Sequence, residues 1–408
     1  MKEYDVIAFG TGSAMNIISE VLRINPNLKV AVIENGPVGG ICLTRGCIPS
    51  KMILYPAKLL AEIRRAKEFG INADIKGVDF EQIMESAYED IMEESAMIER
   101  GIGSHPNIDL YRTTGTFVGE YTVDVGGELI RGEKILLCTG SRPLIPPIKG
   151  LKEAGYVTSD DFFAKVRKLP KSVAVIGGGF IGLELGFFLA SMGSKVTIIE
   201  MLPRVAYAEE PEISQLLEKE LSKIMNIYTN YKVVEVEKRD GEKILHAEHV
   251  KTGESLTINA EEILVAAGRA SNSDITKPEK TGVKTDKRGW IITNEYLETT
   301  KENIWACGDA NGKYLFKHKA NYESIVVLNN AFLGRREKVD YHAVPHAIFT
   351  HPEVGSVGML QSEAEKKYGK DNILVGYYKY ENTAMGQAMK VKDYFVKVIV
   401  KRDDYKIL

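Results

Sequence analysis

The stretch SVAVIGGGFIGLELGFFLASMGSKVTIIE, residues 172–200, decides the fold of this chain. It predicts a short apolar strand, a glycine-rich turn, a helix and a second strand that ends in Glu200. The turn has the spacing GxGxxG with one additional glycine, and its members are Gly177, Gly178, Gly179 and Gly182. This order within about 30 residues is typical of a dinucleotide-binding βαβ unit, whose glycines let a pyrophosphate approach the backbone N–H groups at a helix start.

The same plan opens the chain. Residues 4–34 contain an apolar strand, a turn with Gly10 and Gly12, a helix, and a second strand that ends in Glu34. A carboxylate at this place accepts hydrogen bonds from ribose hydroxyls. The third fingerprint position is Met15, so we expect helix and strand to pack slightly farther apart here. Two βαβ units predict an α/β protein with two dinucleotide sites.

The acidic residue of the second unit bears on the choice of nucleotide. Glu200 favours the unphosphorylated ribose of NAD and repels the additional phosphate of NADP. Arg204 follows closely and is placed to weaken that preference. The sequence therefore favours NAD and leaves NADP open.

A cysteine pair, Cys42 and Cys47, lies in the motif GGICLTRGCIPSK. Gly46 offers the backbone freedom to bring the two Cα atoms within about 7 Å, the limit for a disulfide. Pro49 suits the first turn of a helix, which puts Cys47 near a helix N-terminus where the dipole stabilises a thiolate. Lys51 adds a positive charge. The motif predicts a thiol pair that opens and closes.

Other roles for the cysteines are weighed against a redox role. A zinc site needs about four ligands, and no second Cys pair or His pair accompanies the motif, so we expect no metal. A permanent disulfide does not suit a reducing compartment. Cys138 and Cys307 lie in apolar strand contexts, where a structural role is expected. A catalytic dithiol remains for Cys42 and Cys47.

Composition limits the functional classes. The 408 residues are 44% hydrophobic and carry 53 basic against 56 acidic side chains, a net charge of −3, which gives no case for nucleic acid or an acidic membrane as main partner. No apolar run reaches the roughly 18 residues of a membrane span. Four cysteines are too few for a secreted disulfide scaffold, and the N-terminus MKEYDVIAFG lacks the sections of a signal peptide. We expect a cytoplasmic protein.

The segments between and after the βαβ units differ in character. Residues 52–100 are helical in pattern, and residues 111–139 alternate like strands before a proline-rich linker at Pro143–Pro147. A third domain is predicted after Leu333, with a helix and two strands at 360–368, 373–380 and 394–400.

The end of the sequence resembles an interrupted hairpin. Residues 405–408 begin a returning strand after a turn. A hairpin partner this short leaves its mate poorly paired, so we expect further chain after Leu408.

An ordered set of motifs runs through nearly the whole chain: GGICLTRGCIPSK (39–51), Thr139-Gly140-Ser141, GGGFIGLE (177–184), AAGRASN (266–272), ACGDANG (306–312), LFKHKA (315–320) and FTHPEVGSVG (349–358). In this set the chain resembles the class I pyridine nucleotide-disulfide oxidoreductases, the flavoprotein family of dihydrolipoamide dehydrogenase, glutathione and mycothione reductases, and mercuric reductase. The resemblance implies two Rossmann-like domains and an incomplete α+β interface or dimerisation domain. The implied bounds are 1–145 with 265–337 for FAD, 146–264 for NAD, and 338–408 for the interface.

The resemblance also implies roles for individual residues. Cys47 is the thiolate that faces the flavin, Cys42 attacks the substrate disulfide, and Lys51 pairs with Glu184 beside the ring, although by its sequence context alone Glu184 reads as a solvated helix charge. The implied FAD contacts are Gly10, Gly12, Glu34, Lys51, Gly115, Thr139, Gly140, Ser141, Asp309, Leu315, His318 and Ala320. The implied NAD contacts are Gly177, Gly178, Gly179, Gly182, Glu184, Glu200, Val234 and Gly268.

The implied activity is electron transfer between NAD, FAD, the Cys42/Cys47 disulfide and a small dithiol. Dihydrolipoamide is the favoured dithiol because of CLTRGCIPSK, IGLELG and Glu200. A homodimer is implied, and a 2-oxoacid dehydrogenase complex is a candidate partner.

Other functions stay open. GTGSAMNI and LFKHKANYE look closer to the mycothione reductase branch, which favours a reductase of a low-molecular-weight disulfide; mercuric reductase is a third candidate. The family's His-Glu base motif near the C-terminus is absent here, and His351-Pro352-Glu353 belongs to a different segment. A redox-sensing flavoprotein without turnover is therefore the non-enzymatic alternative.

Overall fold

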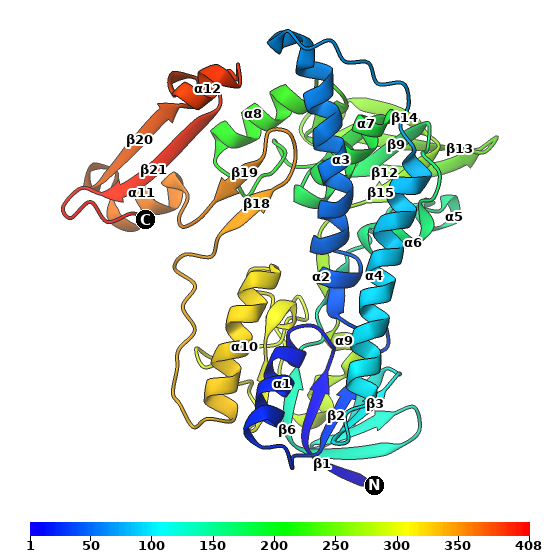
Figure 1. Cartoon of the computed structure of the whole chain (residues 1–408), viewed down its shortest axis with the longest axis vertical. Coiled ribbons are helices and arrows are strands. Elements are labelled where there is room, and N and C mark those ends of the chain that lie inside the picture. The colour runs from blue at the N-terminus through cyan, green and yellow to red at the C-terminus, as the bar shows by residue number, and fades with distance from the viewer. The chain divides into compact units, whose positions relative to one another are not determined.

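The computed structural model describes residues 1–408 and divides into two compact units (Figure 1). Unit 1 consists of Met1–Pro147, Tyr156–Leu169 and Leu264–Asp340. Unit 2 consists of Ile148–Gly155, Pro170–Ile263 and Tyr341–Leu408. The C-terminal segment thus shares a unit with the second βαβ motif, and the three-domain division stays a prediction.

Unit 1 is built on a seven-stranded sheet with the order β3-β2-β1-β6-β5-β4, in which β17 also pairs with β6. The bounds are β1 Lys2–Phe9, β2 Val30–Ile33, β3 Ile108–Tyr111, β4 Gly115–Gly119, β5 Thr122–Val125, β6 Leu129–Leu137 and β17 Ile304–Ala306. β1 runs parallel to β2 and β6, with Phe9 beside Ile33 and Leu137. The carboxyl ends of these strands therefore share one edge of the sheet, where nucleotides bind in such folds.

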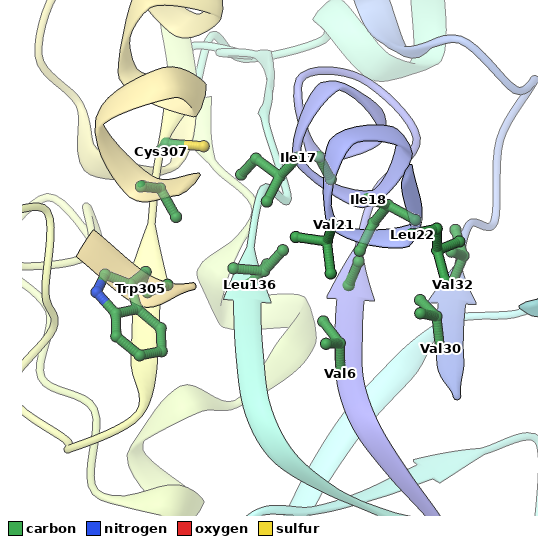
Figure 2. Close-up of a cluster of buried hydrophobic side chains, with 14 of the residues drawn as sticks. Val6, Ile17, Ile18, Val21, Leu22, Val30, Val32, Leu136, Trp305 and Cys307 are labelled. Atoms are coloured by element: carbon green, nitrogen blue, oxygen red, sulfur yellow. The ribbon is translucent and has the colours of Figure 1, made fainter. Parts of the chain in front are cut away.

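The first helix covers this sheet through one apolar face. In α1 (Ala14–Ile24), Ile17, Ile18 and Val21 lie within 2% of full burial and pack with strand residues such as Val6 (Figure 2). Each such side chain stabilises the fold by about 1.5–3 kcal/mol. This packing holds the start of α1 directly after the first glycine turn.

The stretch predicted to be helical at 52–100 contains two helices. α3 (Cys47–Arg65) passes into a short 3₁₀ turn that ends at Gly70 with φ +80°, and α4 (Phe80–Gly103) begins after Asp79. The Asp79 side chain accepts a hydrogen bond from Gln82 N at 2.9 Å and caps α4. The other elements of unit 1 are α2 Gly40–Thr44, β7 Ser141–Pro143, β8 Val157–Thr158, α6 Ser159–Lys165, β16 Arg269–Ser271, α9 Ser273–Thr276 and α10 Lys317–Ala331.

Unit 2 contains the second βαβ motif, as predicted. β10 pairs in parallel with β9 and β11, while β12, β13 and β14 form an antiparallel sheet. The bounds are α5 Leu151–Ala154, β9 Ser172–Ile176, α7 Phe180–Met192, β10 Lys195–Glu200, α8 Pro211–Leu221, β11 Asn226–Thr229, β12 Tyr231–Arg239, β13 Glu242–His249 and β14 Ser255–Ala260.

The C-terminal segment has the predicted helix and strands. The bounds are β18 His346–Ile348, β19 Val354–Ser356, α11 Gln361–Tyr368, β20 Ile373–Lys379, α12 Ala384–Ala388 and β21 Phe395–Lys401. The returning chain lies beside β21, where Leu408 N donates to Ile399 O at 2.9 Å. No helix of the molecule is both long enough and apolar enough to cross a lipid bilayer.

Candidate active site

Glu34 organises the first glycine turn. One carboxylate oxygen accepts hydrogen bonds from Thr11 N at 3.0 Å and Thr11 Oγ1 at 2.7 Å, and the other accepts from Gly36 N at 2.8 Å. Thr11 Oγ1 in turn accepts from Gly39 N at 3.0 Å. These bonds join the turn after β1, the end of β2 and the start of α2.

The glycines of this turn are required by close approaches. Gly10 has φ +91°, and a Cβ there would lie 2.4 Å from Cys138 O. Gly40 has φ +75°, and a Cβ there would lie 2.6 Å from the Cα of Gly12. The turn therefore touches both the end of β6 and the helix that carries Cys42.

The two cysteines of the motif lie on two successive helices. Cys42 lies in α2, and α3 begins at Cys47, so the predicted helix start at the second cysteine is confirmed. A Cβ on Gly46 would lie 2.9 Å from Ile41 O. A close backbone approach, rather than a left-handed φ, thus explains the glycine between the helices.

The two thiols have opposite tendencies to ionise. The pKa of Cys47 is lowered to about 7, first because the Cys42 thiol donates a hydrogen bond to it and further because Lys51 is positively charged. The same hydrogen bond, together with burial, raises the pKa of Cys42. Both cysteines are free thiols here. Cys47 is therefore the thiol of the pair that ionises near neutral pH, and Cys42 keeps its proton.

One cavity in unit 1 contains most of the predicted FAD residues. Gly10, Gly12, Glu34, Gly115, Thr139, Gly140, Asp309, Leu315 and Ala320 line it together with Cys42 and Cys47. Lys51, Ser141 and His318 are not among its lining residues. His318 is exposed and stacks on Phe316 with ring centroids 5.5 Å apart, whereas Ser141 donates to Asp309 Oδ2 at 2.5 Å.

The cavity fits a dinucleotide such as FAD. Its walls run from the ribose-type carboxylate Glu34 to the thiols, and Thr139 Oγ1 is a buried polar atom at the wall without a hydrogen-bond partner in the protein. An orphaned buried hydroxyl costs about 1–3 kcal/mol, which a bound polar ligand would recover. The N-terminus of α1 adds backbone donors suited to a pyrophosphate.

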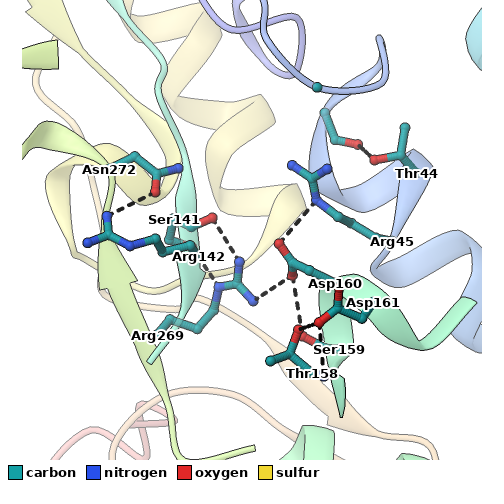
Figure 3. A network of polar contacts seen from close by, with 12 residues as sticks. Thr44, Arg45, Ser141, Arg142, Thr158, Ser159, Asp160, Asp161, Arg269 and Asn272 are labelled. Carbon is teal, nitrogen blue, oxygen red and sulfur yellow. Dashed lines mark hydrogen bonds and ion pairs between the residues drawn. The ribbon is translucent and has the colours of Figure 1, made fainter. Parts of the chain in front are cut away.

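A polar network joins four separate segments of the chain beside this cavity (Figure 3). Arg269 donates to Ser141 Oγ at 2.6 Å and to Ser141 O at 2.9 Å. Asp160 lies 3.2 Å from Arg45 Nε and 3.7 Å from Arg269 Nη1, and its burial raises its pKa. The network holds the side chain of Ser141, and through it Asp309. Arg45, Asp160 and Arg269 were not predicted as site residues, although Arg45 lies within GGICLTRGCIPSK and Arg269 within AAGRASN.

In unit 2 the second glycine turn repeats the carboxylate arrangement. Glu200 accepts from Gly178 N at 2.6 Å and from Leu202 N at 2.7 Å. A Cβ on Gly182 would lie 2.1 Å from Gly177 O, so this glycine permits close contact between helix and turn.

The other predicted NAD residues are spread over both units. A Cβ on Gly179 would meet nothing within 4 Å, which leaves the backbone open to a ligand. Val234 lies where the pairing of β12 with β13 shifts register. Gly268 belongs to unit 1 and has φ +113°.

Glu184 is a buried residue of α7, so its interpretation as a solvated helix charge is wrong. It is 4% exposed, and its Oε1 accepts from Phe349 N at 2.9 Å. Lys51 Nζ donates to Ser50 Oγ at 3.1 Å. The pair of Lys51 with Glu184 links different units and stays a prediction.

Family models match two successive parts of the chain. The model described as "Pyridine nucleotide-disulphide oxidoreductase" matches residues 4–329, and its dimerisation domain matches residues 344–408. The chain belongs to this family. The predicted FAD-dependent oxidoreductase class and the two Rossmann-like folds are thereby confirmed, since members of the family use FAD with NAD(P)H.

Relatives with different named activities have nearly equal sequence identity to this oxidoreductase. Mycothione reductase of Mycobacterium tuberculosis is 32% identical over all of this chain and 89% of its own length. Dihydrolipoyl dehydrogenase of Synechocystis is 31% identical over all of this chain and 88% of its own. Mercuric reductase of Staphylococcus aureus is 32% identical, but the match spans 90% of this chain and 66% of the relative.

A solved structure has the same fold. The HOCl-induced flavoprotein disulfide reductase RclA from Escherichia coli superposes with a TM-score of 0.85 at 25% identity, over 99% of this chain and 88% of that one. The comparisons thus agree on a flavin-dependent disulfide oxidoreductase and do not single out a substrate.

Proposed function

We propose that this oxidoreductase transfers two electrons between a small dithiol and NAD through Cys42, Cys47 and FAD, and that the dithiol is dihydrolipoamide. The observation that carries the proposal is the Cys47 thiol, with its pKa lowered to about 7, at the start of α3 and on the wall of the dinucleotide cavity. A resident thiolate beside a dinucleotide site suits thiol–disulfide exchange coupled to a redox cofactor.

The two cysteines have separate roles in the exchange. When they are joined as a disulfide, a substrate thiolate attacks Cys42, forms a mixed disulfide, and releases Cys47 as the thiolate. The second substrate thiolate then displaces Cys42, so that the substrate leaves as a closed disulfide and Cys42 recovers a proton. The low pKa of Cys47 favours it as leaving group. Bound FAD would supply the two-electron acceptor for the thiols, and bound NAD the acceptor of hydride.

The surroundings of the second turn favour NAD over NADP. Glu200 places a carboxylate beside Gly178, where it repels an additional phosphate. The Arg204 guanidinium donates to Tyr207 O at 3.0 Å and Glu209 O at 3.2 Å, and it stacks on the Tyr207 ring at 4.2 Å. These contacts already engage Arg204, the cation that follows Glu200 in the sequence and could attract the phosphate of NADP.

The proposed partners are a second copy of the chain and a 2-oxoacid dehydrogenase complex. The match to a dimerisation domain supports a homodimer, and dihydrolipoamide as substrate would connect the enzyme to a 2-oxoacid dehydrogenase complex. The cytoplasmic location, the roles of the individual site residues and the absence of a metal remain parts of this proposal.

Anaerobic reduction of the flavin tests the substrate. Dihydrolipoamide, NADH and NADPH are added separately to the FAD-loaded protein, and the loss of flavin absorbance is recorded. We expect bleaching by dihydrolipoamide and by NADH, with a much weaker response to NADPH. Bleaching by NADPH but not by dihydrolipoamide would overturn the proposed substrate.

The second candidate is a reductase of a low-molecular-weight disulfide, which the match to mycothione reductase over the whole chain favours. It predicts that NAD(P)H-reduced enzyme is reoxidised by such a disulfide, while dihydrolipoamide reduces the flavin poorly. Reoxidation by mercuric ion alone would instead favour the third candidate.

A further inference from the structure

The two cysteines that the redox motif does not contain lie in contact with each other. Cys138 follows β6 and Cys307 follows β17, and the parallel register places Leu137 beside Ala306 immediately before them. Their sulfur atoms are 3.3 Å apart. Neighbouring strands are spaced by about 4.8 Å, which is within the Cα separation that a disulfide spans.

The backbone on both sides of this thiol contact is held in place. Cys138 N donates to Phe9 O at 3.1 Å, and Gly308 N, directly after Cys307, donates to the buried carboxylate of Glu323 at 2.6 Å. Glu323 also forms a fully buried ion pair with Lys319 at 3.1 Å. The contact is therefore fixed by two anchored loops, and closure to an S–S bond of about 2.05 Å requires side-chain movement only.

All four cysteines of the chain line the same cavity. Cys138 is partly exposed on the wall, whereas Cys307 is 2% exposed and packs in the core cluster shown in Figure 2. Cys138 is therefore the more accessible of the two thiols. Cys307 keeps its proton, because its hydrogen bond to Cys138 and its burial raise its pKa.

We propose that Cys138 and Cys307 are a second redox pair, separate from the catalytic dithiol, which closes reversibly when the enzyme meets a hydroperoxide. The Cys138 sulfur attacks the peroxide, so that an S–O bond forms, the O–O bond breaks and one water (or alcohol) leaves. The Cys307 sulfur then attacks Cys138, the S–S bond forms, the S–O bond breaks and a second water leaves. Two thiols and one hydrogen peroxide thus give one disulfide and two waters. A dithiol reductant reopens the bond.

The test uses the FAD-loaded Cys42→Ser/Cys47→Ser variant of the 408-residue chain, in which Cys138 and Cys307 are the only remaining thiols. Hydrogen peroxide is added in slight excess, and thiols are titrated after denaturation. We expect the count to fall from two to zero and to return to two with dithiothreitol. In the matched control with Cys307→Ser added, the Cys138 sulfenic acid should persist and be trapped by dimedone. Retention of both thiols, or a loss that dithiothreitol does not reverse, would overturn the proposal.

A second measurement does not depend on folding of the variant. Wild-type holoenzyme is treated with peroxide, its free thiols are blocked, and it is digested with trypsin. The proposal requires a peptide pair that joins Ile135–Lys149 to Glu302–Lys313 and separates on reduction. Blocked, unlinked peptides at both positions would contradict it. Neither experiment depends on the substrate of the catalytic pair.

Discussion

The two βαβ units use the same carboxylate arrangement around different glycine turns. Glu34 accepts hydrogen bonds from Thr11 N and Gly36 N, and Glu200 accepts from Gly178 N and Leu202 N. In both units the carboxylate therefore fixes the turn before any nucleotide binds. The turn of unit 1 also bonds to the start of α2 through Thr11 and Gly39, and the turn of unit 2 bonds to the loop after β10, where Ala206 N donates to Gly178 O at 2.8 Å.

The units differ at the third fingerprint position. In unit 2 a Cβ on Gly182 would clash with Gly177 O at 2.1 Å, whereas in unit 1 the half-buried Met15 packs against the core beside Ile18. The fingerprint glycine is thus needed only where the helix lies against the carbonyl of its own turn. The expectation that helix and strand are farther apart at Met15 stays a prediction.

The largest expected effect is that of Cys47→Ser, which should stop reduction of the flavin by the dithiol at unit 1 but not reduction by NADH at unit 2. In Cys47→Ser, reduction of the flavin by dihydrolipoamide should fall by about 10³-fold or more, because the hydroxyl does not ionise near neutral pH. Reduction by NADH should persist, since the turn of unit 2 is unchanged. Stopped-flow flavin absorbance measures both rates. FAD should remain bound, but the long-wavelength thiolate-to-flavin band should disappear; its persistence would refute the assignment of Cys47.

Gly182→Ala examines the fingerprint difference directly. The added methyl must displace the glycine turn, and overpacking of this kind costs about 1–3 kcal/mol. If NADH binding has to restore the turn, the same cost raises the Kd of NADH by roughly 5- to 150-fold. FAD retention should not change. Met15→Ala is the matched control in unit 1 and should leave NADH binding as it is. Wild-type affinity in Gly182→Ala would show that the close approach is dispensable.

The pH dependence of Cys47 alkylation tests whether Cys42 lowers the pKa of Cys47 beyond the effect of a helix start. Alkylation of the reduced protein by iodoacetamide should have its midpoint near pH 7, followed on the peptide Gly46–Lys51. A lowered pKa means that the thiolate and the stability it contributes are present at alkaline pH and are lost as the pH falls through about 7. Cys42→Ala should raise the midpoint, because the strongest stabilising hydrogen bond is removed. An unchanged midpoint would assign the shift to Lys51 and the helix instead.

The smallest effect is expected for Arg204→Ala in unit 2. Its guanidinium is engaged by backbone oxygens and the Tyr207 ring, so the ratio of NADH to NADPH affinity should change by less than about threefold. Titration of the flavin signal with each nucleotide gives the two Kd values. A large loss of NADPH binding would mean that Arg204 leaves these contacts to bind phosphate.

The βαβ units and the redox motif could be predicted because their signals are local. The apolar strands, glycine spacing and terminal glutamates all lie within short stretches, and Pro49 marks the helix that begins at Cys47. The break near Gly70 was missed because the helical pattern continues on both sides of it. Burial of Glu184 was missed for a related reason. The sequence of an apolar helix with one acidic residue does not show that a distant backbone donor, here Phe349 N, bonds to that residue.

By itself, the sequence determined the two dinucleotide folds and the family, and it singled out Cys42 and Cys47 as the predicted catalytic pair. Only the tertiary structure decided how Asp160 connects Arg45 with Arg269, and that Cys138 and Cys307 touch. These contacts join residues separated by more than a hundred positions, and the parallel pairing of β6 with β17 creates the thiol contact. Periodicity and spacing report on neighbours along the chain, whereas the register between distant strands exists only once the sheet has formed.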